Sequence, residues 1–101
     1  MKRRRASSRK AAHADEVRGF QDIPNIGPAM TGDFAKLGIR TPAELAKQDP
    51  YALYAKLQRI TGVHQDPCVC DTFIAAVRFM QGGPAVPWWH YTAERKRHFG
   101  R

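Results

Sequence analysis

The chain has 101 residues, of which 43% are hydrophobic, and its formal net charge is +8 at pH 7. This length allows a single domain with a modest core and little room for an enclosed catalytic cavity. The composition excludes a wholly disordered chain, no apolar run could span a bilayer, and no apolar stretch follows the basic N-terminus as a secretory signal would require.

The positive charge is concentrated at the two ends of the chain. The first twelve residues contain six cations, and residues 93–101 add a net charge of +3, whereas residues 13–92 contain seven cations and eight anions. We therefore expect a disordered basic arm (1–12), a folded domain (13–92) and a basic C-terminal tail (93–101). The two ends would supply non-specific attraction to a polyanion.

Apolar residues at helical spacing predict a first helix over residues 13–22, which Pro24 ends. A tight connection follows, and a second helix begins at Pro28 and ends at Gly38. Three further helices are predicted where a capping residue precedes proline, at Thr41-Pro42, Asp49-Pro50 and Asp66-Pro67. No strand-like alternation occurs, so we expect an all-α fold of about five short helices with flanking basic arms.

The connection between the first two helices carries the functional hypothesis. The run Phe-Gln-Asp-Ile-Pro-Asn-Ile-Gly-Pro-Ala-Met, residues 20–30, resembles the helix-hairpin-helix motif, whose hairpin commonly reads Leu-Pro-Gly-Ile-Gly-Pro. A tight turn that leads into a helix leaves backbone N–H groups unpaired, and these groups attract a phosphate. We expect Gly27, with the amides of Ile26, Ala29 and Met30, to bind one DNA phosphate.

Three positions depart from the motif. Asn25 stands where the motif usually has glycine, Ala29 and Met30 lie where lysine is frequent, and Pro28 has no N–H to donate. Asn25 and Gly27 are both residue types that tolerate a positive φ. Two interpretations therefore stay open, a phosphate-binding hairpin and a packing device that joins two helices.

A second resemblance extends over most of the chain. Asp66-Pro67-Cys68-Val69, with Trp88-Trp89 downstream, resembles the bacterial pathogenicity-locus helix-hairpin-helix family, whose members are often labelled mitomycin-resistance proteins. This resemblance covers roughly residues 17–91. Residues 23–57 are also similar to the C-terminal domain of competence regulators of the Sxy/TfoX type. The resemblance implies the helical fold and implies no activity.

Cysteine, histidine and tryptophan residues suggest weaker alternatives. Cys68 and Cys70 would point to opposite sides of one helix, so we expect no mutual disulfide, no zinc site with His64 or His90, and a reducing, cytoplasmic compartment. A redox-sensitive enzyme would need Cys68 with a pKa lowered by its helix N-terminus. Trp88 and Trp89 could stack on bases, but we expect at least one to fill the core.

The sequence thus favours a non-enzymatic accessory module that binds the duplex DNA backbone without reading sequence. Besides the hairpin, the expected phosphate contacts come from the two ends of the chain: Arg3, Arg4, Arg5, Arg95, Lys96 and Arg97. The alternative is a protein-interaction module in which the hairpin is structural and the basic ends bind an acidic partner or RNA. Neither interpretation involves a cofactor, a metal, a membrane or a small-molecule substrate.

Overall fold

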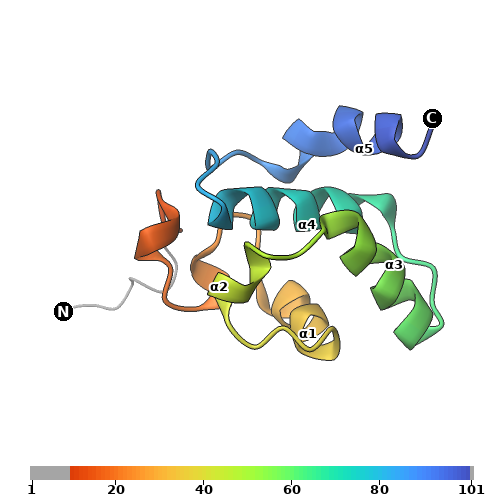
Figure 1. The fold of residues 1–101 in the computed structure, drawn as a ribbon, viewed down its shortest axis with the longest axis horizontal. Coiled ribbons are helices and arrows are strands. Elements are labelled where there is room, and N and C mark those ends of the chain that lie inside the picture. The colour runs from red at the N-terminus through yellow and green to blue at the C-terminus, as the bar shows by residue number, and fades with distance from the viewer. Residues whose placement is uncertain (1–9, 101) are drawn as a thin grey trace.

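The computed structural model describes residues 10–100 of the chain (Figure 1). Its α-helices are α1 (Pro28–Lys36), α2 (Pro42–Leu45), α3 (Pro50–Thr61), α4 (Pro67–Met80) and α5 (Thr92–His98). Its 3-10 helices are η2 (Ala14–Glu16), η3 (Phe20–Asp22) and η4 (Trp88–Tyr91). Residues 10–100 contain no strand, so the all-α prediction is confirmed. None of the helices in this range is long and apolar enough to cross a membrane.

Helix α4 is the centre of the fold. It lies between α5 on one side and α1, α2 and α3 on the other (Figure 1). Nine of its fourteen residues are buried, and the ring of Phe73 lies 5.6 Å from that of Phe34 on α1. The largest fully buried apolar side chains are those of Phe34, Phe73, Phe79, Ile23, Ile26, Leu45, Leu57 and Ile74. The two hairpin isoleucines thus belong to the same core as α4.

The three proline-containing helix starts form as the sequence predicts. The carboxylate of Asp49 accepts a hydrogen bond from the Tyr51 amide (2.9 Å), and that of Asp66 accepts one from the Cys68 amide (3.0 Å). At α2, the carboxylate of Glu44 accepts bonds from the backbone N–H groups of the two residues at 40 and 41. Each of these helices therefore has a carboxylate of its own beside its N-terminus.

The predicted helix over residues 13–22 is wrong. Two 3-10 turns, η2 and η3, take its place, separated by an extended stretch that includes Gly19 (φ −138°). The carboxylate of Asp22 accepts hydrogen bonds from the Arg18 and Gly19 amides, and that of Glu16 accepts bonds from the amides at 12 and 13. These side chain–backbone bonds compete with continuous helical pairing and explain the break.

Both ends of the folded region extend further than expected. Residues 10–12 were expected in a disordered arm, but the Ala11 amide donates to the Asp22 carbonyl (2.8 Å). Residues 1–9, including Arg3, Arg4 and Arg5, lie outside the described range. At the other end, residues 93–98 do not form a free tail, because α5 packs against α4 and η4. The folded unit therefore includes α5.

Candidate nucleic-acid interface

The hairpin, defined here as residues 23–27, is a tight turn between η3 and α1. The side chains of Ile23 and Ile26 are fully buried, and the Ile26 amide donates to the Ile23 carbonyl (3.1 Å). This bond uses the Ile26 N–H within the turn. Ile26 was expected to offer its amide to a phosphate, and the structure corrects that expectation.

Asn25 takes the position that needs left-handed backbone geometry, with φ +75°. Asparagine adopts this conformation more readily than most non-glycine residues, which explains how the turn forms without a glycine at position 25. Its side-chain amide donates to the Val86 carbonyl (2.9 Å) in the segment between α4 and α5. The extra bulk of asparagine is therefore used to join the hairpin to residues far along the chain.

Gly27 is the N-cap of α1 and has extended geometry, with φ −115° and ψ −168°. Any residue type can adopt this conformation, so Gly27 does not supply the positive φ for which the sequence made it a candidate. A Cβ atom at this position would meet no atom within 4 Å. What glycine gives here is an open approach to the start of α1 and the absence of a capping side chain.

Helix α1 begins without a carboxylate of its own. It has no side-chain cap and no acidic residue in its first turn, in contrast to α3 and α4, which Asp49 and Asp66 cap. Within residues 10–100, no acceptor pairs with the amides of Gly27, Ala29 or Met30. The α1 N-terminus therefore combines free N–H groups with the positive end of a nine-residue helix, which is the arrangement that favours an anion.

A lysine supports the hairpin from an unexpected direction. The Lys10 ammonium donates to the carbonyls of Gln21 and Ile26, each at 2.6 Å. Sequence reasoning missed this contact because Lys10 and Ile26 are sixteen residues apart and no periodic pattern connects them. Residues 10–35 nevertheless contain two cations and four anions. The local charge therefore does not favour an anion at this end of the molecule, and the groups here that do are backbone amides.

The C-terminal cations divide into two kinds. Arg95 lies with 16% of its side chain exposed, and its Nε donates to the fully buried Asp71 carboxylate at 2.9 Å. This hydrogen bond raises the pKa of Arg95. The expected phosphate contact of Arg95 is thus corrected to an internal ion pair. Lys96 and Arg97, on the same helix, are exposed.

The cysteines and tryptophans also differ from expectation. Cys70 is buried, which raises the pKa of its thiol to about 12, and burial with the neighbouring Asp66 carboxylate raises the pKa of Cys68. The expectation that the helix N-terminus lowers the pKa of Cys68, as a catalytic thiol would need, is therefore wrong.

Trp88 is half-buried and Trp89 is 62% exposed, and neither belongs to the core. The aromatic residue of this segment that lies in the core is Tyr91, so the prediction of a core tryptophan is wrong as well.

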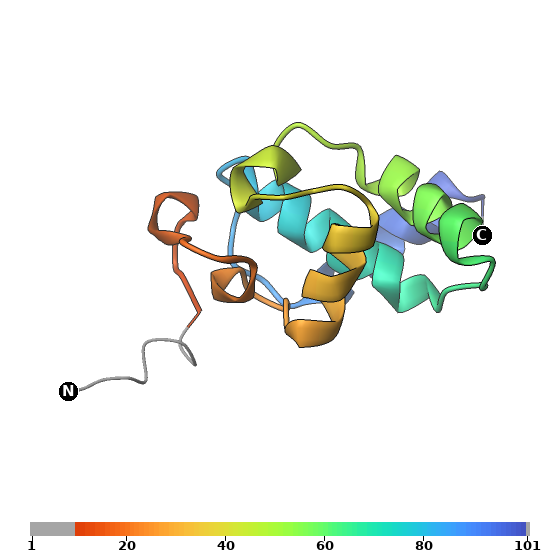
Figure 2. The same ribbon diagram turned by 90° about the horizontal axis from the view of Figure 1, so that it is seen from below.

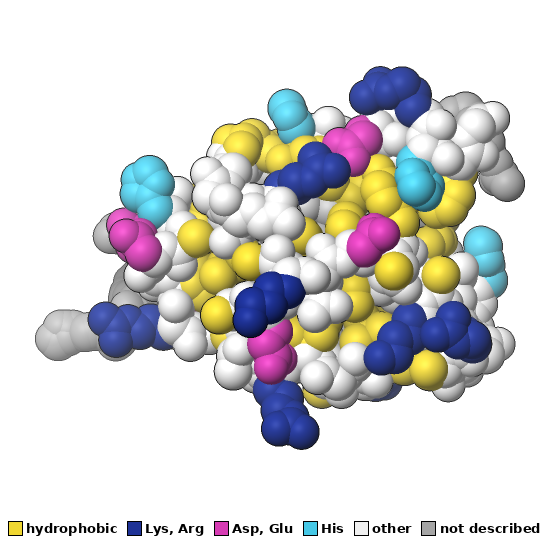
Figure 3. All heavy atoms as spheres, in the orientation of Figure 1, with side chains coloured by type: hydrophobic (Ala, Val, Ile, Leu, Met, Phe, Trp, Pro, Cys, Tyr) yellow, Lys and Arg dark blue, Asp and Glu magenta, His cyan; other side chains and the backbone are white. Residues whose placement is uncertain are grey.

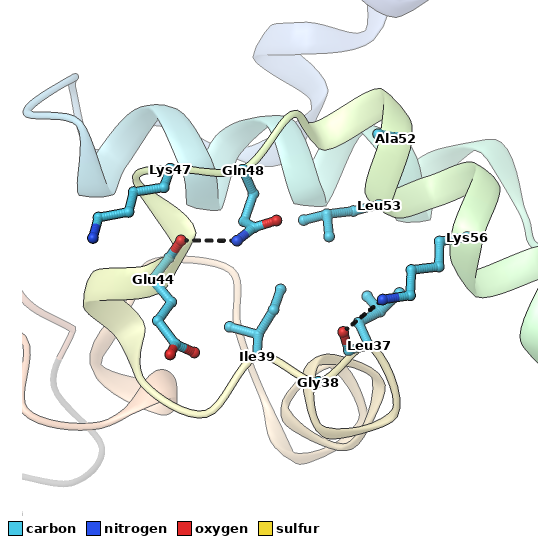
Figure 4. Close-up of a pocket in the computed structure, with 9 residues that line it drawn as sticks. All are labelled: Leu37, Gly38, Ile39, Glu44, Lys47, Gln48, Ala52, Leu53 and Lys56. Atoms are coloured by element: carbon cyan, nitrogen blue, oxygen red, sulfur yellow. Dashed lines mark hydrogen bonds between the residues drawn. The ribbon is translucent and has the colours of Figure 1, made fainter.

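The opposite end of α1 opens into a pocket of about 460 Å³ between α1, α2 and α3 (Figure 4). Leu37, Ile39 and Leu53 lie along it, and the Lys56 ammonium donates to the Leu37 carbonyl (3.2 Å). Residues 36–60 contain five cations and two anions, and Figure 3 shows lysine and arginine side chains over α2 and α3. Residues 36–60, called the basic surface below, therefore carry a net charge of +3, which the nearly neutral charge of residues 13–92 does not reveal. No group of three or more potential metal ligands occurs among the described residues.

Comparisons with known proteins agree on one family. Residues 13–97 match the family described as Pathogenicity locus (Cdd1). The mitomycin resistance protein McrB of Streptomyces lavendulae is 44% identical over 75 residues, which cover 74% of this chain and 71% of that protein. No solved structure matches. The matched range includes almost all of α5, in agreement with the packing of that helix on α4.

Proposed function

This chain belongs to the pathogenicity-locus (Cdd1) family, and within it we propose a non-enzymatic module that binds the DNA backbone without reading base sequence. The observation that supports this proposal is the open N-terminus of α1. Its amides at Gly27, Ala29 and Met30 lack acceptors among the described residues, whereas α3 and α4 start at their own carboxylates. A phosphate oxygen supplies the acceptor that α1 lacks.

The chemistry of such a contact is positional. Backbone amides meet a phosphate in the same way at every nucleotide, so the contact fixes the protein on the strand and carries no base information. Lys10, which donates to the carbonyls of Gln21 and Ile26, adds one cation beside the site. The exposed Lys96 and Arg97, with the cations of residues 1–9, would add salt-dependent attraction as each neutralises a phosphate.

The substitution Gly27→Asp tests this proposal because it separates folding from binding. Aspartate at this extended N-cap would supply the carboxylate that Asp49 and Asp66 supply at α3 and α4. Aspartate and glycine differ by only a few tenths of a kcal/mol at an N-cap, in favour of aspartate, so folding should be kept or slightly stabilised. The same carboxylate occupies the amides and repels a phosphate. We therefore expect affinity for unrelated duplexes to fall by about 1.5–3 kcal/mol, the scale of a charged hydrogen-bonding site.

Two control variants sharpen the measurement, which is fluorescence anisotropy with two duplexes of unrelated sequence. Gly27→Asn caps the helix without a negative charge and should have an intermediate effect. The double variant Lys47→Gln/Lys56→Gln removes cations beside the pocket, which lies at the other end of α1, roughly 14 Å along the helix axis. It should reduce affinity less than Gly27→Asp does.

If a folded Gly27→Asp variant binds both duplexes as tightly as the parent, the hairpin contact is wrong. If only the lysine double variant loses affinity, DNA is bound on the basic surface instead. If the parent itself binds no duplex at low salt, the alternative takes precedence: a protein-interaction module with a structural hairpin, whose basic ends bind an acidic partner or RNA.

A further inference from the structure

The segment between α4 and α5 presents a tryptophan to solvent. Trp89 is 62% exposed, although tryptophan is usually largely buried in folded proteins. Trp88 meets it edge-on, with ring centroids 5.4 Å apart and an interplanar angle of 84°. This contact leaves most of the Trp89 side chain open, and Tyr91, not tryptophan, fills the adjacent core position. Core packing therefore does not account for Trp89.

The segment that carries Trp89 is held firmly. The Gly83 amide donates to the Arg78 carbonyl at 2.8 Å, and a Cβ at Gly83 would lie 2.8 Å from that same oxygen. Only glycine fits such a close backbone approach, so the chain leaves α4 along a defined path. Val86 packs against the core, and Pro84 and Pro87 restrict the backbone on either side of it. Trp89 is therefore presented on a fixed support.

The same support is joined to the hairpin. The side-chain amide of Asn25 donates to the Val86 carbonyl, which lies in the segment that leaves one end of α4 and leads to α5 (Figure 2). Trp89 lies three residues after Val86, a span of at most about 10 Å. Asn25 in turn stands two residues before Gly27. The hydrogen bond between Asn25 and Val86 therefore joins the segment that carries the exposed indole to the turn that leads into the free α1 amides.

From this juxtaposition we infer that Trp89 is a stacking platform for an unpaired nucleobase, so that the hairpin region prefers single-stranded DNA over an intact duplex. This inference rests on the proposed function, since the α1 amides bind the backbone of the strand whose base stacks on Trp89. Bases in an intact duplex have no free face to offer, whereas a single strand does. Stacking on an aromatic ring tolerates every base, so binding remains independent of sequence.

The test compares three probes of equal length: a 12-nucleotide oligo-dT strand, a 12-base-pair duplex, and an abasic deoxyribose-phosphate strand. Trp89→Ala should weaken binding to oligo-dT by roughly 5-fold to 150-fold, the range that base–aromatic stacking supplies. It should leave affinity for the duplex and the abasic strand unchanged. Trp89→Phe keeps a stacking ring and should retain most of the affinity for oligo-dT. Trp89→Leu keeps apolar area without a ring and should behave like Trp89→Ala.

Intrinsic fluorescence gives a direct signal, because the chain has two tryptophans. In a Trp88→Phe background the remaining emission comes from Trp89, and oligo-dT should quench it while the abasic strand does not. Equal affinities of parent and Trp89→Ala for oligo-dT, without quenching, would overturn the inference. Equal losses in Trp89→Ala on oligo-dT and the abasic strand would overturn it too, since the contact would then involve the backbone.

The failure of this inference can be told from failure of the proposed function. If Gly27→Asp weakens binding to all three probes while Trp89→Ala changes none, the backbone contact holds and base stacking is wrong. If Trp89→Ala weakens oligo-dT binding while Gly27→Asp has no effect, stacking holds and the α1 phosphate site is wrong. If Trp89→Ala changes no DNA affinity but abolishes self-association in sedimentation, the exposed indole belongs to a protein interface.

Discussion

Replacing Arg95 by methionine should destabilise the protein through Asp71, its partner on α4. The Asp71 carboxylate is fully buried and accepts hydrogen bonds from Arg95 Nε (2.9 Å), from Arg95 Nη2 (3.4 Å) and from the Thr92 hydroxyl (2.7 Å). In Arg95→Met the Asp71 carboxylate keeps the hydrogen bond from the Thr92 hydroxyl and loses the neighbouring positive charge of Arg95. A buried charge without its partner costs about 3–5 kcal/mol, a large share of the roughly 5–15 kcal/mol that stabilises a domain of this size.

We expect the lower end of this range, about 3 kcal/mol, because α5 is short and can detach. Detachment of α5 lets water reach the Asp71 carboxylate, and it breaks only the remaining contacts that α5 makes. One of these is the ion pair between Arg78 and Glu94 (2.7 Å), in which both side chains are about one-third exposed. An ion pair with this exposure contributes about 0–1 kcal/mol. Another is the stack of His98 on Tyr51, with ring centroids 3.6 Å apart.

Urea unfolding followed by far-ultraviolet circular dichroism measures the effect. Arg97→Met is the matched control, since Arg97 is exposed on the same helix, and it should change stability by less than about 0.5 kcal/mol. The double variant Asp71→Asn/Arg95→Met removes the orphaned charge and should recover part of the loss. Equal stabilities of Arg95→Met and Arg97→Met would refute the reasoning, and Arg95 would then be free for the phosphate contact that its sequence position suggested.

Three further predictions follow from local chemistry. Hydrogen bonds from backbone amides or from Arg78 lower the pKa values of four carboxyl groups, those of Asp22, Glu44, Asp66 and Glu94. The stability that these groups add is therefore present above pH about 4.5 and should be lost progressively as the pH falls. A pH series of thermal unfolding midpoints that stayed level below pH 4 would contradict this. At pH 7, a thiol reagent should modify Cys68 slowly and Cys70 only after unfolding, because burial raises both thiol pKa values; two fast-reacting thiols in the native protein would disagree. Asn25→Ala should destabilise the protein more than Asn25→Gly in urea unfolding, since both lose the bond to Val86 but only alanine strains the left-handed backbone by about 1–2 kcal/mol; equal losses would argue against that strain.

The sequence by itself determined the helices whose boundaries depend on near neighbours. Asp49 and Asp66 bond to amides two residues ahead, and Gly62 ends α3 with a left-handed backbone. These interactions are complete within one helical turn, so the residue types and their spacing are sufficient to place them. The all-α fold and the position of the hairpin were predictable for the same reason.

Only the tertiary structure decided which groups are engaged and which remain free. Lys10 reaches Ile26 across 16 residues, Arg95 reaches Asp71 across 24, and Asn25 reaches Val86 across 61. Such contacts depend on how distant segments pack around α4, and neither the charge nor the spacing of residues along the chain predicts them. The packing turned an expected DNA-binding arginine into an internal ion pair. It also left Trp89 exposed and placed Tyr91, two residues later, in the core beside α4.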